Sequence, residues 1–106
     1  MQNMPVGSVW TYHANPRTPW VYVDTSRKVP AGEGTWRNGN ELTVMGEIRA
    51  EDGESVTVEI DPADVFGIPG EFVLGQLQMP MRTRHIRHAD FVAHWRFAYM
   101  RESGSA

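Results

Sequence analysis

The alternation of apolar and polar residues between positions 42 and 60 constrains the fold of this chain more than any other feature. Apolar or small residues occupy every second position on both sides of the acidic stretch 51–54, "EDGE". A period of two residues is that of a strand with one face towards a core, and a short polar stretch with glycine is typical of a turn. The pattern predicts an antiparallel hairpin. The residues expected to face the core are Leu42, Val44, Gly46, Ile48, Val56, Val58 and Ile60.

Glycine at position 46 of this pattern stands where a side chain is expected to pack, so we expect a bulge or a sharp bend there. Two shorter strands are predicted from aromatic and apolar alternation over residues 8–13 and 20–24, with a long loop over residues 25–34. Asn38-Gly39 is the residue pair that accepts positive φ in a two-residue hairpin turn.

The second half of the chain predicts two helical segments and one more strand. Asp61 can cap a single helical turn that has Pro62 at its first position and ends at Gly67. Residues 71–79 are interpreted as a strand and residues 89–102 as a terminal helix. On that helix the face predicted to pack on the sheet comprises Phe91, Val92, Trp95, Ala98 and Tyr99.

These elements predict an α+β, mainly β fold: a small, strongly bent antiparallel sheet or an SH3-like, partly open barrel with a C-terminal helix. The order of elements over residues 8–79 resembles that of an SH3-like barrel, with a long loop after the first strand, a central hairpin, one helical turn and a last strand. We expect one domain over residues 1–102, followed by a frayed tail at 103–106.

Composition excludes several classes of site. The chain has no cysteine, so disulfides, thiolate metal ligands and a thiol nucleophile are absent. No apolar run approaches the ~20 residues of a membrane-spanning helix, and the first ten residues lack a signal-peptide pattern. The sequence contains neither a P-loop nor a G-x-S-x-G motif. We therefore expect a cytoplasmic protein that is not an enzyme, needs no cofactor and has no membrane partner.

Charge is distributed unevenly. Residues 33–71 carry ten acidic side chains against two arginines, whereas residues 72–106 carry five arginines against two acids. Two interpretations stay open. The arginines of the stretch 82–87 either form a binding surface or pair with the acidic central hairpin.

Nucleic-acid binding is one function that this stretch could serve. Arginine side chains suit phosphate oxygens, and exposed rings of Trp10, Trp20 or Trp36 could stack on bases. The isoelectric point of about 5.7 argues against such a role. The arginines that would contact nucleic acid are Arg82, Arg84, Arg87 and Arg96.

A metal site is a weaker candidate. Imidazole and carboxylate are suitable ligands for a divalent ion, and the candidate ligands are His85, His88, Asp90 and His94. The competing interpretation is that Asp90 and His94 form an i,i+4 pair on one helix.

A protein-contact surface is the function that we favour. Phe97 and Met100 point away from the packing face of the predicted helix, and His94 and Arg101 lie beside them. Aromatic, methionine and arginine side chains are common in contact surfaces. The sequence thus predicts a non-enzymatic module that binds another protein or a second copy of itself, with a small nucleic-acid-binding barrel as the alternative.

Overall fold

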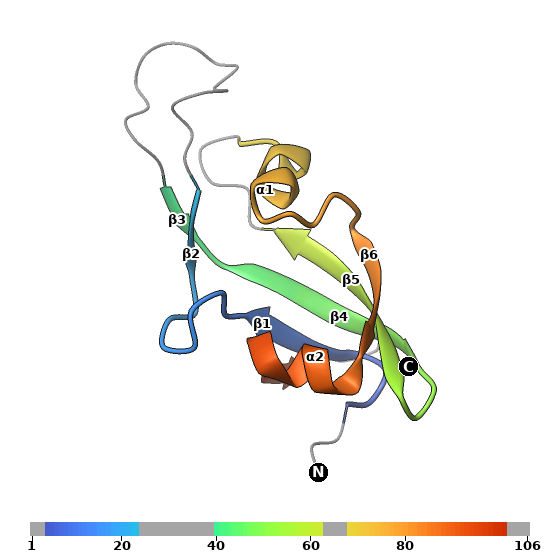
Figure 1. Ribbon diagram of the computed structural model, residues 1–106. Helices are drawn as coiled ribbons and strands as arrows, with labels where there is room; N and C mark the ends of the chain where they lie inside the picture. Colours follow the sequence, from blue (N-terminus) through green and yellow to red (C-terminus); the bar gives the residue numbers. More distant parts are fainter. Residues whose placement is uncertain (1–3, 24–39, 63–67, 102–106) are drawn as a thin grey trace.

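A computed structural model describes residues 4–23, 40–62 and 68–101, and about half of these residues lie in strands (Figure 1). The strands are β1 (Ser8–Tyr12), β2 (Val21–Val23), β3 (Asn40–Leu42), β4 (Val44–Glu51), β5 (Ser55–Pro62), β6 (Thr83–Arg87) and β7 (Trp95–Met100). The helices are α1 (Gly70–Gln76) and α2 (His88–His94). Neither of these helices is long and apolar enough to cross a membrane.

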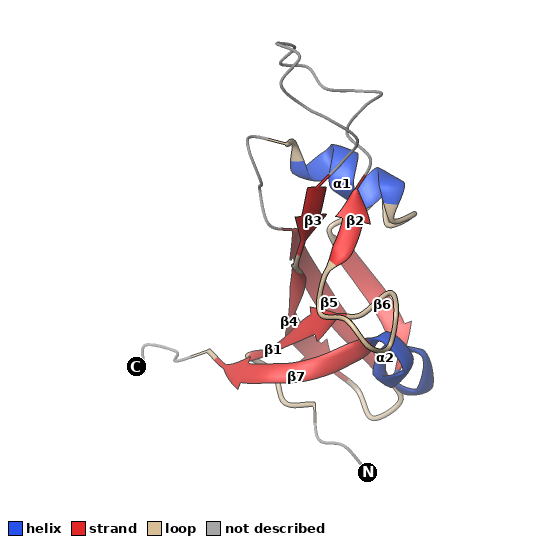
Figure 2. Cartoon of the chain, turned by 90° about the vertical axis from the view of Figure 1, so that its left-hand side faces the viewer, coloured by secondary structure: helices blue, strands red, loops and turns tan. Residues whose placement is uncertain are grey.

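Five strands form one antiparallel sheet in the order β6-β5-β4-β1-β7, and β2 pairs separately with β3. The sheet is bent and does not close, so β6 and β7 are its two edge strands (Figure 2). The expectation of a mainly β fold built on a bent antiparallel sheet is confirmed. The predicted strands near residues 8–13 and 20–24 are present as β1 and β2.

The central hairpin of β4 and β5 is also confirmed. Its register places Gly46 opposite Ile60 and Ile48 opposite Val58, and the residues predicted to face inwards are buried. We call the side of the sheet that carries them the inner face and the opposite side the outer face. The bulge lies between Ile48 and Ala50 rather than at Gly46.

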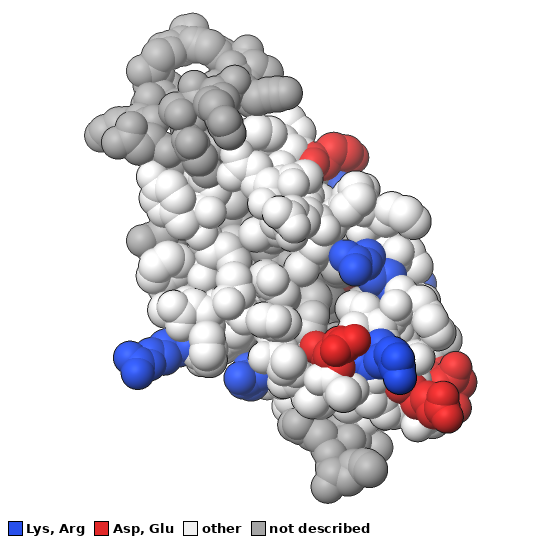
Figure 3. Space-filling model, in the orientation of Figure 1, with Lys and Arg blue, Asp and Glu red and all other residues white. Residues whose placement is uncertain are grey.

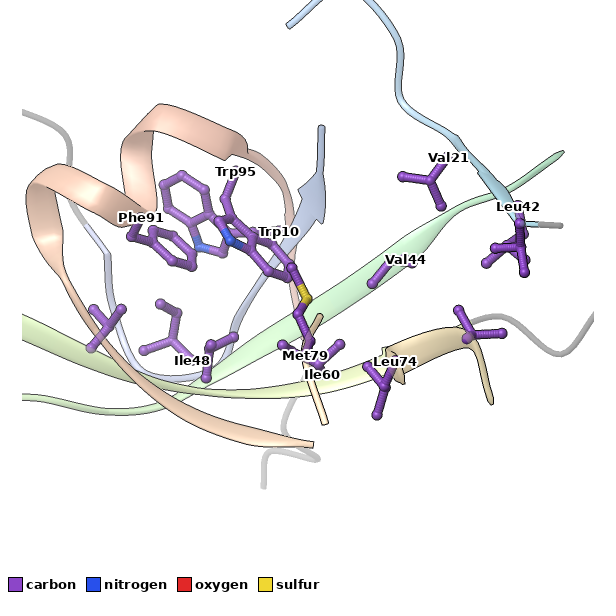
Figure 4. Close-up of a cluster of buried hydrophobic side chains, with 14 of the residues drawn as sticks. Trp10, Val21, Leu42, Val44, Ile48, Ile60, Leu74, Met79, Phe91 and Trp95 are labelled. Atoms are coloured by element: carbon purple, nitrogen blue, oxygen red, sulfur yellow. The ribbon is translucent and has the colours of Figure 1, made fainter. Parts of the chain in front are cut away.

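The core fills the inner face (Figure 4). At one end, Trp10, Phe91 and Trp95 lie against one another, and at the other end Val73 and Leu74 of α1 cover the sheet. Gly46 is needed because the Trp95 ring lies above it: a Cβ at position 46 would stand 3.0 Å from that ring and 2.7 Å from Val58 Cγ2. The glycine therefore permits close packing rather than a bend.

The strand predicted over residues 71–79 is wrong, because the chain forms helix α1 there. Val73, Leu74 and Leu77 are spaced so that a helix turns all three towards the core, and Phe72 packs at the margin of that face. This spacing outweighs the short alternation seen in the sequence. Asp61 and Pro62, predicted to begin a helical turn, belong to strand β5. The remainder of that turn lies outside the described residues.

The terminal helix predicted over residues 89–102 is wrong beyond His94. The chain leaves α2 there and runs along β1 as strand β7, with Tyr12 opposite Trp95 and Val9 opposite Tyr99. Helical periodicity is a local signal, whereas β1 would otherwise leave one edge without backbone partners. The predicted Asn38-Gly39 turn, the long loop 25–34, the ring of Trp36 and the tail 103–106 all lie outside the described residues.

Candidate protein-contact surface

Strand β7 carries the largest group of exposed apolar side chains on one described element. Five of its six residues are exposed, and only Trp95 is buried. Phe97, Tyr99 and Met100 are 49%, 46% and 48% exposed. Because β7 is an edge strand with β1 on one side only, it also presents backbone N–H and C=O groups that no strand of this sheet can pair.

A bulge in the pairing of β7 with β1 spreads these side chains over both faces of the sheet. Trp10 lies opposite Phe97, but Val9 lies opposite Tyr99, so Ala98 is an extra residue. Such an insertion reverses the alternation of side chains. Phe97 therefore lies on the inner side with Trp10, and Tyr99 lies on the outer side with Val9.

Aromatic contacts hold the start of β7 firmly in the core. The Trp95 ring stacks on Phe91 with centroids 5.4 Å apart and lies 5.1 Å from the Tyr12 ring. The Phe97 ring meets Trp10 edge to face at 5.7 Å. These pairs fix the backbone of β7 while the outer parts of Phe97, Tyr99 and Met100 stay in solvent, so the exposed strand is ordered before any partner arrives.

Arginines mark both ends of the exposed stretch. Arg96 Nη1 donates hydrogen bonds to the main-chain oxygens of Val92 and Trp95, at 3.0 and 3.1 Å. Arg101 Nε donates to Glu47 Oε1 at 2.9 Å. Both guanidinium groups are thus engaged within the chain, and the solvent-exposed apolar surface of β7 lies between them.

The outer face beside β7 is a charge network. Glu47 Oε1 lies 3.5 Å from Arg49 Nη1, which in turn lies 3.4 Å from Glu59 Oε1. These exposed pairs contribute little stability individually. They cover the middle of the outer face with alternating charge, so the apolar surface ends where β1 meets β4.

The other edge strand, β6, has a different character. The register places Arg84 opposite Val58 and Ile86 opposite Val56, on the inner side, and turns His85 and Arg87 outwards. Arg82, just before β6, lies 3.6 Å from Asp61 and 3.8 Å from Glu71. Among the described residues, Arg84 and Arg87 make no ion pair.

The four arginines considered for nucleic acid are therefore dispersed. Arg82 is paired with acids, Arg84 and Arg87 project from opposite sides of β6, and Arg96 lies on β7 at the far edge. On the face drawn in Figure 3, acidic and basic side chains are interspersed. Of the proposed stacking rings, Trp10 is fully buried, which makes that expectation wrong, while Trp20 is partly exposed.

The residues considered for a metal site have separate neighbours. His85 Nδ1 lies 3.2 Å from Thr57 Oγ1, and His94 Nδ1 lies 3.3 Å from the main-chain oxygen of His13. His88 Nε2 approaches Glu51 Oε2 at 3.1 Å without hydrogen-bond geometry. Within residues 4–23, 40–62 and 68–101, no three His, Asp or Glu side chains converge as metal ligands.

Sequence reasoning placed Phe97, Met100, Arg101 and His94 in one contact surface, and the structure divides this group. Phe97 and Met100 are exposed on β7, and Arg101 follows directly after them. His94 is exposed at the end of α2. Tyr99 was missed because the predicted helix turned it inwards; the strand-forming run Trp95-Arg96-Phe97 was the signal that could have found it.

Comparison of the chain with known proteins finds no matching family model, no matching curated protein and no matching solved structure.

Proposed function

We propose that this chain is a non-catalytic protein-interaction module whose contact element is the edge strand β7. The observation that carries the proposal is an ordered edge strand with three large, half-exposed apolar side chains, Phe97, Tyr99 and Met100. Edge strands recruit an additional strand through main-chain hydrogen bonds, and side chains then determine which strand fits.

A second copy of the chain is the partner that we favour. Two identical edge strands related by a twofold axis run antiparallel, so each main-chain donor meets an acceptor of the other copy. The apolar side chains of both strands would be covered in the same step. Arg96 and Arg101 already form hydrogen bonds within their own chain. Pairing of two β7 strands can therefore leave these hydrogen bonds in place.

The mass in solution tests this proposal. We expect sedimentation equilibrium of the full chain to give a mass above 12.0 kDa that rises with protein concentration. Met100→Lys should return the chain to the monomer mass with an unchanged melting temperature, because Met100 lies at the surface and a lysine on an edge opposes pairing. Met81→Lys is the matched control, since Met81 is also an exposed methionine and lies outside β7.

A wild-type chain that stays monomeric at all concentrations would contradict self-association. A Phe97→Asp variant is a second test of whether β7 is the contact element. It should also abolish association, at some cost in stability because the Phe97 ring touches Trp10. Equal loss of association in Met81→Lys would show that β7 is not the contact element.

Binding of single-stranded nucleic acid is the second candidate. It is supported by Arg84 and Arg87, which make no ion pair among the described residues and lie on one strand. Labelled oligonucleotide should then show salt-dependent anisotropy in the presence of the protein. Unchanged anisotropy at low salt would remove this candidate.

An SH3-like identity for the sheet is likewise a proposal. The bent five-stranded antiparallel sheet supports it, and its failure to close fits the partly open form expected from the sequence. It assigns no ligand, because a fold hosts many functions.

A further inference from the structure

The open side of the sheet contains a cavity of about 300 Å³ that β7 pairing does not use. Its lining residues come from β6 and α2 and from the ends of β1 and β5. Its floor is formed by the buried side chains Ile60, Met79 and Trp95. At about 30 Å³ for each water molecule, the cavity holds on the order of ten waters, which is the size of a small organic molecule.

Arg84 is the chemically distinctive residue of this cavity. Its position opposite Val58 places it on the inner side of β6, where it is half-buried next to Ile86. Among the described residues, the Arg84 guanidinium makes no hydrogen bond and no ion pair. A planar cation on an apolar wall is pre-organised to take a carboxylate in a two-point contact.

The surroundings of Arg84 leave room for an anion. Burial raises the pKa of the Tyr12 phenol above its ordinary value, and the charge of Arg84 partly opposes this rise. Tyr12 is therefore neutral and can donate its O–H. The one acid that lines the cavity, Asp90, makes no ion pair with Arg84. Within the described residues, no carboxylate therefore occupies the Arg84 guanidinium.

We propose that this cavity binds a small aromatic carboxylic acid, with Arg84 pairing with the carboxylate and Tyr12, Met79 and Trp95 contacting the ring. The floor offers a flat indole edge and a flexible thioether, both of which pack well on an aromatic ring. The open mouth lets the ligand enter without movement of the sheet. The inference is independent of the pairing of β7, because the cavity uses only the buried ring of Trp95 and none of the exposed side chains of that strand.

Phenylacetate is the probe, and nuclear magnetic resonance of the full chain is the readout. We expect titration to shift the amides of Ile60 and Arg84 and the indole N–H of Trp95. The neutral isostere phenylacetamide should bind at least about tenfold more weakly, because it removes a charge-assisted contact. Equal binding of the acid and the amide would overturn the proposal.

Two variants assign the effect to Arg84. Arg84→Gln should weaken phenylacetate binding about tenfold or more, whereas Arg84→Lys should retain part of the affinity because it keeps the charge. Arg17→Gln removes an equal charge from an exposed loop outside the cavity and should bind as the wild type does. Unaltered binding in Arg84→Gln, or no shifts with phenylacetate at millimolar concentration, would contradict the proposal. Shifts at Arg84 with inorganic phosphate alone would also overturn it, in favour of a phosphate site.

Discussion

The two edges of the five-stranded sheet differ in the properties that govern strand pairing. β6 presents Arg84, His85 and Arg87, with a paired Arg82 just before it. β7 presents Phe97, Tyr99 and Met100, and Arg96 near its start and Arg101 just after its end flank them. Charged edge strands resist association with other chains, whereas apolar edge strands invite it. One sheet therefore has a charged edge strand that opposes pairing with another chain and an apolar edge strand that favours it.

The edges also differ in how they are attached. β7 begins with Trp95, which is buried between Phe91 and Tyr12. β6 contributes only the partly buried Ile86 to the core. The apolar edge is thus the more firmly anchored of the two, so its exposed side chains belong to an ordered strand and not to a frayed end.

Substitution of the side chains that anchor the two edge strands should give the largest difference in stability between them. Trp95→Ala is expected to reduce the free energy of unfolding by about 3–5 kcal/mol, because it removes a buried ring. Ile86→Ala should cost only about 1–2 kcal/mol, because Ile86 is partly exposed. Urea denaturation of both variants measures the difference. Equal losses would mean that the two edges are anchored alike.

Substitution of Gly46 tests how tightly the Trp95 ring packs on β4. A Cβ at this position would lie 2.7 Å from Val58 Cγ2 and 3.0 Å from the Trp95 ring. Gly46→Ala should therefore destabilise the fold by about 1–3 kcal/mol through overpacking. Gly75→Ala is the matched control, because nothing lies within 4 Å of its Cβ and it belongs to α1. The control should stabilise by about 0.5–1 kcal/mol. A neutral Gly46→Ala would show that Trp95 is loosely held.

The smallest effect concerns the turn beside β6. Asp52 Oδ1 accepts the main-chain N–H groups of Glu54 and Ser55 at 3.0 and 2.8 Å. These bonds, with a lesser contribution from the charges of His85 and His88, hold the pKa of Asp52 below its ordinary value of 3.8. The pKa of Asp52 is lower in the folded chain than in the unfolded chain, so the ionised carboxylate stabilises the fold. This stabilisation is complete well above pH 3.8 and is lost as the pH falls through the folded-state pKa.

Asp52→Ala should therefore show less acid destabilisation between pH 6 and pH 3 than the wild type. Asp52→Asn keeps an acceptor oxygen without the carboxylate and should share the flatter pH dependence while preserving more of the stability at pH 6. Urea midpoints at both pH values measure this. An acid loss in Asp52→Ala as large as that of the wild type would assign the pH dependence to other carboxylates.

Sequence reasoning predicted the half of the fold that depends on local alternation. The hairpin of β4 and β5 follows from a two-residue period that continues over many residues, with a turn that its own Asp52 stabilises. β7 could not be predicted in this way. Phe91, Trp95 and Tyr99 have helical spacing in the sequence, and only the free edge of β1 decides that the chain extends after His94.

The candidate site was predicted in part for the same reason. Phe97 and Met100 are exposed whether residues 95–100 form a helix or a strand, so their exposure was predictable. The role of Tyr99, the bulge at Ala98 and the position of Arg84 on a cavity wall depend on register. Register is set by the pairing of segments that are distant in the sequence, so it cannot be predicted from the residues of one strand.

Hydrogen exchange of backbone amides at increasing protein concentration tests the central claim about β7 most directly. We expect amides of residues 95–100 that do not bond to β1 to exchange more slowly as the concentration rises, while amides of residues 83–87 are unaffected. Met100→Lys should abolish the slowing. Exchange in β7 that is independent of concentration, or slowing confined to β6, would show that β7 is not where the chain associates.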